Sequence, residues 1–314
     1  MGGYKSLPFA TYDLAVYLPG GAVLIVLAQY TLETVIGAPF LPNVEHFGSD
    51  TVDTVVLAIL WLSSSYLAGH LGAYLSSLVV EKFVHNALSY PSTVWLKKEE
   101  YTKAGIPSQQ FLRNFFRRNA LSYSWSGSSV IAFIFLFPLW IPFIFFFIAR
   151  PVGFYDPKLP EGLLDDVRHE FGKVSLSVEV QEGSRWEKLV EHFVANNCPL
   201  AYQRMYNYLV IYGALRLLAF IMIVAAWIII IKSLWVFIGS TDWEFSSRRI
   251  ILLSGVSFAG YFSMLAFAKF NRRFFEECVL ALLLANKSPN EGVIERRLRF
   301  RSWSDTFRGG VSGR

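Results

Sequence analysis

Long runs of uncharged, apolar residues constrain this chain more than any other feature of its sequence. Of its 314 residues, 54% are hydrophobic and 17% are aromatic, and they are concentrated in continuous runs rather than alternating as core positions of a soluble protein do. A run of about 20 apolar residues is long enough for a helix to cross the ~30 Å hydrocarbon core of a bilayer. The sequence therefore predicts an all-α integral membrane protein that crosses the membrane several times.

Four of these runs are predicted to be transmembrane helices. They lie at about 14–32, 55–80, 209–237 and 250–268. In the first of them, Pro19, Gly20 and Gly21 predict a kink or a loosened turn. Residues 1–80 and 208–268 are thus expected to form two transmembrane hairpins, each made of two spans.

The distribution of lysine and arginine predicts the side of the membrane that each loop occupies, because these residues are retained in the cytoplasm. Residues 33–50 contain neither, so we expect this loop outside. Residues 81–123 contain seven of them against three acidic residues, so the basic segment 81–127 is expected in the cytoplasm. Within this segment, Ser108 is a candidate N-cap for a helix of mixed aromatic and basic residues, which suits the membrane interface.

Residues 128–150 form a further apolar stretch whose path is ambiguous. It is long enough to cross once, but Pro138 and Pro142 bracket three residues near its middle, where proline interrupts a helix. A full crossing would export the sixteen lysines and arginines of 151–207 and 269–314. A re-entrant or monotopic hairpin that turns at the two prolines keeps them inside, as the charge rule favours. We therefore predict four crossings plus a re-entrant hairpin that other helices shield, and keep a fifth crossing as the alternative.

The polar segment 151–207 predicts a small cytoplasmic element. Its hydrophobic pattern suggests short helices near 161–171 and 184–196, with a short strand at 174–181 between them. Residues 269–314 are expected to continue as a cytoplasmic helix and an arginine-rich tail. This layout places both termini in the cytoplasm, and we expect the membrane to be a bacterial inner membrane.

Four arginines of the tail, interleaved with aromatic residues, form a candidate lipid-binding site. They are Arg296, Arg297, Arg299 and Arg301. Because they follow a membrane domain, we expect them to contact anionic lipid headgroups. The same composition also suits nucleic acid, which is the less favoured partner.

A polar stripe runs along the second predicted span. Its members His70, Tyr74, Ser77 and Glu81 follow one another by four, three and four residues, which places them on one helix face that leads toward the cytoplasm. An ionisable residue inside a membrane is costly unless it is paired or hydrated. The stripe therefore either lines a hydrated path or carries a protonatable switch. The alternative, which we favour, is that neutral His70 bonds a facing helix and Glu81 lies at the water interface.

The third predicted span offers a partner for this stripe. Arg204, Tyr208, Tyr212 and Arg216 are spaced by four and share a helix face. If the two helices are neighbours, Arg216 can pair with Glu81. The interpretation that we favour is an interfacial tyrosine belt in which Arg216 reaches the cytoplasmic surface.

Small residues occupy every fourth position of another face of the second span. They are Ser65, Gly69, Ala73 and Ser77. This spacing lets helix backbones approach closely in lipid. We interpret it as a helix-packing face, and it suggests a homo-oligomer.

No cofactor or metal site is expected. Cys198 and Cys278 are the only cysteines and lie far apart, which argues against a disulfide framework and a cysteine-based metal site. Acidic residues and histidines gather in two places, at Asp165, Asp166, His169 and Glu170, and at Glu187, Glu191 and His192. Neither group matches a metal-binding motif, and charged surface helices commonly carry such pairs.

These features together predict a non-enzymatic membrane protein, a homo-oligomer that forms or gates a permeation path under control of its cytoplasmic region. The stripe and the re-entrant hairpin motivate this reading, because both need protein-lined polar space in the bilayer. The alternative is a membrane anchor or scaffold that recruits a cytosolic protein partner. A membrane-embedded lipid-modifying enzyme with His70 or His169 as base is less favoured, because the sequence holds no catalytic motif.

Overall fold

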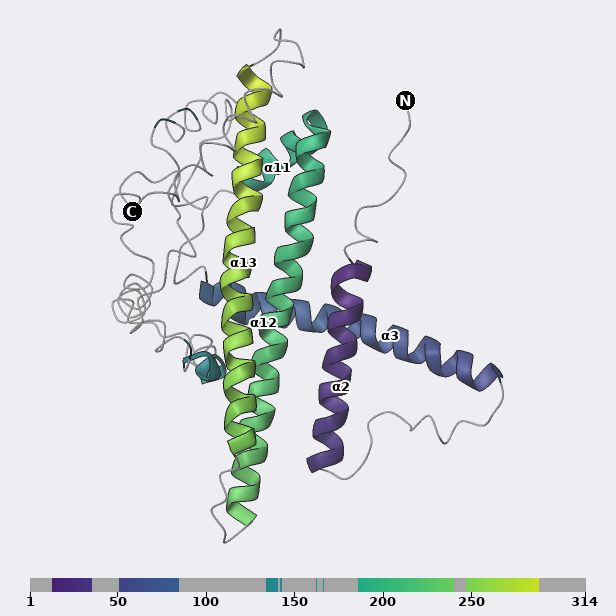
Figure 1. The fold of residues 1–314 in the computed structure, drawn as a ribbon. Coiled ribbons are helices and arrows are strands. Elements are labelled where there is room, and N and C mark those ends of the chain that lie inside the picture. The colour runs from purple at the N-terminus through teal and green to yellow at the C-terminus, as the bar shows by residue number, and fades with distance from the viewer. Residues whose placement is uncertain are drawn as a thin grey trace, which may run out of the picture. The chain divides into compact units, whose positions relative to one another are not determined.

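The computed structural model describes residues 13–35, 51–84, 134–140, 142, 162, 166, 186–239 and 247–287 (Figure 1). Every secondary-structure element in these ranges is helical. In chain order they are η1 (Asp13–Tyr17), α2 (Leu18–Val35), α3 (Thr51–Ser76), η3 (Ser77–Glu81), η4 (Phe137–Leu139), α11 (Trp186–Asn197), α12 (Pro199–Gly239) and α13 (Ser247–Lys287). Of these, η1 and η3 are π-helical turns and η4 is a 3₁₀ turn.

Four helices are long and apolar enough to cross a membrane. They cover Leu14–Glu33, Thr51–Val84, Pro199–Val236 and Ser247–Ala285. The prediction of an all-helical chain with four such helices is thus confirmed for the described residues. Both α12 and α13 extend well beyond the predicted apolar runs. The charges at Lys269, Arg272 and Arg273 end the apolar run of α13 without ending its helix, because lysine and arginine are good helix formers.

The chain divides into two compact units. Unit 1 comprises Met1–Leu159 and Arg204–Phe275, and unit 2 comprises Pro160–Gln203 and Glu276–Arg314. Unit 1 contains α2, α3, η4 and the apolar parts of α12 and α13. Unit 2 contains α11 together with the start of α12 and the end of α13.

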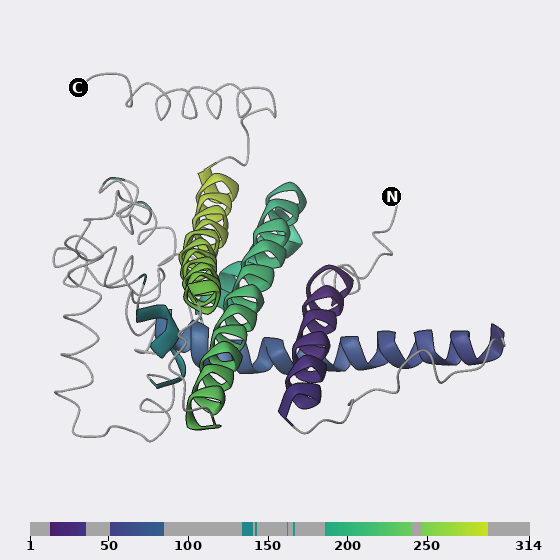
Figure 2. The ribbon, with the colours of Figure 1, turned by 60° about the horizontal axis from the view of Figure 1, so that its bottom comes forward.

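In unit 1, α2 and α3 meet at backbone contact distance. A Cβ atom built at Gly21 would lie 1.7 Å from the carbonyl oxygen of Ser65, and one built at Gly69 would lie 1.9 Å from that of Tyr17. Ser65, Gly69 and Ala73 are buried. At Ser65 and Gly69 the predicted helix-packing face is covered by α2 and the preceding turn of the same chain (Figures 1 and 2). The close helix contact that suggested a homo-oligomer is therefore made between two helices of the same protomer.

The helices α12 and α13 form an antiparallel pair in unit 1. The rings of Tyr208 and Phe270 are 6.1 Å apart, and those of Tyr212 and Phe267 are 6.0 Å apart. Further along, a Cβ atom built at Gly260 would lie 3.2 Å from the Cβ of Met222. The core of unit 1 is built on this pair. Its buried members are Val80, Val84, Leu136, Leu139, Ala219, Phe220, Ile223, Tyr261, Met264, Phe267 and Ala268.

The proline-bracketed segment packs into this core. Leu136 and Leu139 are buried, and the backbone N–H of Leu139 donates to the carbonyl of Leu136 over 2.9 Å in the 3₁₀ turn. In a regular α-helix that N–H would have bonded the carbonyl of Phe135. The indole N–H of Trp227 takes its place and donates to that carbonyl over 2.7 Å. Of the predicted hairpin, residues 134–140 and 142 are described, and the path of the rest of 128–150 lies outside the described residues.

Replacing Trp227 with phenylalanine is expected to lower the free energy of unfolding by about 1–2 kcal/mol, the cost of leaving a partly buried carbonyl without its donor. Trp235→Phe is the matched control, because Trp235 lies on the same helix and is 71% exposed. Thermal denaturation of the purified protein in detergent measures both. Equal midpoints for the two variants would show that the indole bond contributes nothing.

Unit 2 contains buried apolar residues on two helices. Val190 and Val194 of α11 are fully buried, and Cys278, Val279 and Leu282 at the end of α13 are buried as well. The helix predicted near 184–196 is thus present as α11. Several other predicted features lie outside the described residues. They are the interfacial helix after Ser108, the strand at 174–181, most of the helix near 161–171, and the arginines of the tail.

Candidate functional site

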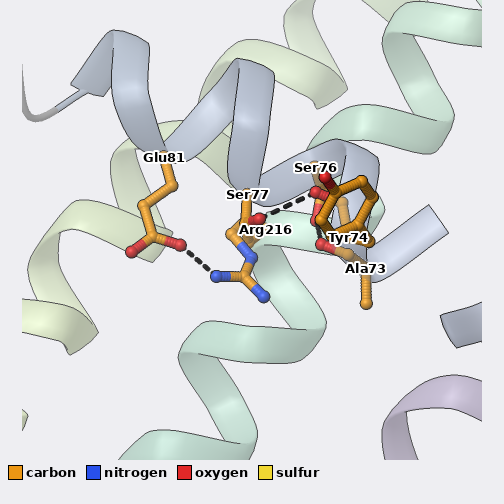
Figure 3. A network of polar contacts seen from close by, with 6 residues as sticks. All are labelled: Ala73, Tyr74, Ser76, Ser77, Glu81 and Arg216. Atoms are coloured by element: carbon orange, nitrogen blue, oxygen red, sulfur yellow. Dashed lines mark hydrogen bonds and ion pairs between the residues drawn. The ribbon is translucent and has the colours of Figure 1, made fainter. Parts of the chain in front are cut away.

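An ion pair joins two long apolar helices of unit 1. The guanidinium of Arg216 on α12 donates a hydrogen bond to the carboxylate of Glu81, the last residue of η3 (Figure 3). The side chains of Arg216 and Glu81 are 14% and 29% exposed, so the pair is largely withdrawn from solvent. This is the pairing that the sequence offered as the less favoured alternative. Arg216 does not simply extend to the surface.

A three-helix junction positions this pair. Leu217, which is 2% exposed, follows Arg216 on α12 and fits against two glycines. A Cβ atom built at Gly20 of α2 would lie 2.3 Å from its side chain, and one built at Gly72 of α3 would lie 3.0 Å from it. Adjacent residues of α12 therefore touch Gly72 and Glu81, which are about 13 Å apart along α3. The geometry means that α3 crosses α12 instead of running beside it (Figures 1 and 2).

The π-helical turn η3 aims Glu81 at Arg216. A π turn takes an extra residue into one turn of helix, so the side chains after it are rotated by about 100° from the positions of a regular α-helix. Such turns are frequent at functional sites. Glu81 closes this turn and carries the carboxylate of the pair.

The pair lies at one end of the most apolar stretch of α12. Residues 217–231 carry no charged side chain. Arg216 precedes this stretch and Lys232 follows it, about 24 Å further along the helix. At that end, the ammonium of Lys232 donates to the hydroxyl of Tyr30 on α2 over 2.7 Å. Both polar contacts thus flank a stretch not much shorter than the ~30 Å hydrocarbon core of a bilayer.

The other members of the predicted stripe are engaged separately. The ring of His70 lies against those of Tyr17 and Tyr66, with centroid distances of 4.1 and 4.4 Å. Tyr74 is 61% exposed, and the hydroxyl of Ser77 donates to the carbonyl of Tyr74 over 2.7 Å (Figure 3). The structure brings Glu81 to Arg216 and leaves His70 in an aromatic environment. The four stripe residues therefore do not face one common partner.

Only some of the residues weighed as metal ligands lie in the part of the chain that the structure describes. Asp165, His169 and Glu170 lie outside the described residues. Within the ranges that the structure describes, no group of three or more histidine, cysteine, aspartate or glutamate residues could hold a metal ion.

Sequence reasoning missed two residues and one contact that shape unit 1. Trp227 has a usable signal, because a tryptophan in the middle of an apolar run is away from the interfaces where this residue is enriched and its N–H needs a partner. Nothing in the sequence distinguishes Leu217 as a packing residue, since it is one leucine among many. The contact between Lys232 and Tyr30 depends on how α2 and α12 are placed, which no local pattern encodes.

These observations define the class. Four long apolar helices, with charged contacts at the ends of an uncharged stretch, indicate a polytopic helical membrane protein. No family model matches the chain, and neither a curated protein nor a solved structure matches it.

Proposed function

We propose that this chain is a non-enzymatic membrane protein that forms or gates a permeation path, and that the Glu81–Arg216 pair holds the gate in its resting state. The observation that carries the proposal is an ion pair between α3 and α12, two helices that are otherwise almost uncharged over their apolar lengths. Charged residues at such positions mark ion or substrate pathways in membrane proteins.

An ion pair of this kind suits a gate because its paired and separated states differ in how much water they need. While paired, Arg216 and Glu81 neutralise each other and need little water. Once separated, each charge has to be hydrated, so water must enter the junction between α3 and α12. A shift of the end of α3 relative to α12 would separate the two side chains.

The experiment compares ion flux through liposomes that contain the wild type, Glu81→Gln, or the charge swap Glu81→Arg with Arg216→Glu. We expect Glu81→Gln to raise the flux of potassium or chloride several-fold, because the resting contact is lost. The swap restores the contact with reversed polarity and is expected to bring the flux back toward the wild-type value. Flux that is the same in all three proteins would contradict the gating role.

The proline-bracketed segment supports a re-entrant arrangement. Trp227, which bonds the carbonyl of Phe135, lies within the uncharged stretch 217–231. Backbone that is not regularly helical is tolerated within a bilayer only where protein shields it from lipid. Leu136 and Leu139 of this segment pack against buried residues of α12 and α13. We extend the proposal to four crossings of a bacterial inner membrane, with both termini and unit 2 on the cytoplasmic side.

This topology predicts that Cys198 is protected from a membrane-impermeant thiol reagent in intact cells and reacts after permeabilisation. Cys198 is the suitable reporter because it is partly exposed, whereas Cys278 is buried. Reaction of Cys198 in intact cells would mean that residues 128–150 cross the membrane and that unit 2 is outside.

A second candidate is a membrane anchor or scaffold that recruits a cytosolic protein. One observation favours it, namely that α11 belongs to a compact unit distinct from unit 1. A scaffold needs such a module and needs no gate. Liposomes that stay impermeable to ions with the wild type and with every pair variant would favour this candidate.

A further inference from the structure

We propose that the permeation path selects small monovalent anions, and that Arg216 is the residue that selects them. This inference rests on the proposed gate and adds the class of ion that passes it. Arginine and lysine side chains line pores that pass anions, whereas acidic side chains line pores that pass cations. The class of ion therefore depends on which charge remains at the junction of α3 and α12 when the ion pair separates.

Arg216 has donor groups that Glu81 does not use. Its guanidinium carries five N–H groups in a fixed planar arrangement, and the carboxylate of Glu81 accepts from Nη1 (Figure 3). The Nε–H points away from Nη1, is buried, and has no hydrogen-bond partner among the described residues. Together with Nη2 it forms the edge through which an arginine binds an anion with two hydrogen bonds. An acceptor bound at this edge is favourable, because a buried donor without a partner is costly.

Arg216 is the member of the pair that stays in the junction. Its side chain is 14% exposed, and the next residue, Leu217, packs against Gly20 and Gly72 of the two helices that α12 crosses. Glu81 is 29% exposed, so its carboxylate can turn toward water. Arginine keeps its proton in proteins. Separation of the pair therefore leaves a positive charge in the junction.

The part of α13 that packs beside Arg216 is uncharged. The antiparallel pairing of α12 with α13 places residues 260–267 there, because Tyr212, one turn before Arg216, has its ring 6.0 Å from that of Phe267. None of these residues of α13 is acidic or basic. The first acidic residue of α13 is Glu276, nine residues after Phe267 and about 13 Å further along the helix. No carboxylate of α13 thus lies at the level of the pair.

The carboxylates of α2 and α3, apart from that of the pair itself, are also remote from Arg216. Asp53 lies in the first turn of α3, about 42 Å along the helix from the pair. Glu33 of α2 follows Tyr30 by one turn, and Tyr30 contacts Lys232 at the far end of the uncharged stretch of α12. Within these helices, the carboxylate of the pair is therefore the one that balances Arg216.

A second cation lies at the other end of the uncharged stretch 217–231. Lys232 donates to the hydroxyl of Tyr30, and its Nζ lies 4.7 Å from the centroid of the same ring. Tyr30 is a neutral partner, and Lys232 forms no ion pair within the described residues. The whole of α12 contains no acidic residue. An anion that moves along this helix therefore meets an attractive charge at each end of the stretch.

The test measures reversal potentials with the purified full-length protein in planar bilayers that separate concentrated from dilute potassium chloride. The background variant is Glu81→Gln, which the proposed gate predicts to conduct. In this variant we expect chloride to be preferred over potassium by about tenfold or more, because one charge attracts the anion and repels the cation at the same point.

Substitutions of Arg216 in the Glu81→Gln background test whether this residue sets the preference. Arg216→Lys keeps the charge and should keep chloride preferred. Arg216→Gln removes the charge, leaves no unpaired charge that would hinder folding, and should bring the permeability ratio to within about twofold of unity. Arg216→Glu should favour potassium. The matched control is Arg204→Gln, which removes an exposed cation about 18 Å earlier on α12, beyond the ~10 Å screening length, and should change the ratio by less than about twofold.

The outcomes distinguish this inference from the proposed gate. Potassium preference in Glu81→Gln, which a carboxylate such as Asp13 at the start of η1 would produce, would overturn the anion assignment, although the current would still support the gate. Chloride preference that survives Arg216→Gln would overturn it in the same way. Absence of current in every variant would contradict the gate, and the assigned class of ion with it.

Discussion

Replacing Gly69 with alanine is expected to lower the free energy of unfolding by about 3 kcal/mol, near the upper end of what overpacking a core usually costs. The new Cβ atom would lie 1.9 Å from the carbonyl oxygen of Tyr17, a backbone atom that cannot turn away. The two helices have to separate by more than an ångström to admit it. Separation also loosens the buried contact of Gly21 with Ser65.

Two other glycines provide matched controls for this substitution. Nothing lies within 4 Å of a Cβ atom built at Gly255 of α13, so Gly255→Ala should be neutral or stabilising by up to about 1 kcal/mol, the gain in helix propensity. At Gly72 the closest atoms are the ends of the flexible side chains of Leu24 and Leu217, which can move. We therefore expect Gly72→Ala to be intermediate.

Thermal denaturation in detergent, followed by size-exclusion recovery of folded protein, measures this series. The expected order of stability is Gly255→Ala, then Gly72→Ala, then Gly69→Ala. If Gly69→Ala were as stable as Gly255→Ala, the close crossing of α2 and α3 would not exist in the folded protein.

The sequence predicts the helices of this fold well because composition alone determines them. A run of about 20 uncharged apolar residues has few folded forms open to it besides a buried or membrane helix. The ends of α12 and α13 are less predictable. Charges at Lys269 and Arg272 mark where the apolar run stops, and helix propensity continues through them to Lys287.

The small-residue face shows what a spacing pattern can and cannot predict about helix packing. Its four-residue spacing predicts a surface of α3 that another backbone approaches closely, and at Gly69 the backbone of Tyr17 lies that close. The spacing encodes how closely a partner helix can approach and carries no information on which helix that is. The partner is α2 of the same chain, and the expectation of a second copy has no further support from this face.

The polar stripe shows where periodic reasoning fails. The spacing from His70 to Glu81 assumes 3.6 residues per turn throughout, but η3 is π-helical over Ser77–Glu81. Glu81 is therefore turned away from the face that carries Tyr74. Its pairing with Arg216 depends on a contact between residues 135 positions apart. The sequence presented this pairing as a possibility, and only tertiary packing selects it.

Replacing Glu81 and replacing Arg216 are expected to lower the free energy of unfolding by different amounts. Glu81→Gln leaves Arg216 charged, since a guanidinium does not lose its proton in proteins, and the arginine is the more buried partner. Removing one member of a buried pair costs about 3–5 kcal/mol, and partial exposure reduces this, so we expect about 3 kcal/mol for Glu81→Gln. Arg216→Met leaves Glu81, which is 29% exposed and can reach water, and we expect about 1–2 kcal/mol.

The double variant Glu81→Gln with Arg216→Met separates the pair from other effects of each substitution. It leaves no uncompensated charge, so its free energy of unfolding should return to within about 1 kcal/mol of the wild type. The control is Lys232→Met with Tyr30→Phe. This pair removes a more exposed polar contact at the other end of α12 and should cost less than about 1 kcal/mol. If the two single losses simply add in the double variant, Glu81 and Arg216 are not energetically coupled, and the contact cannot hold a resting state.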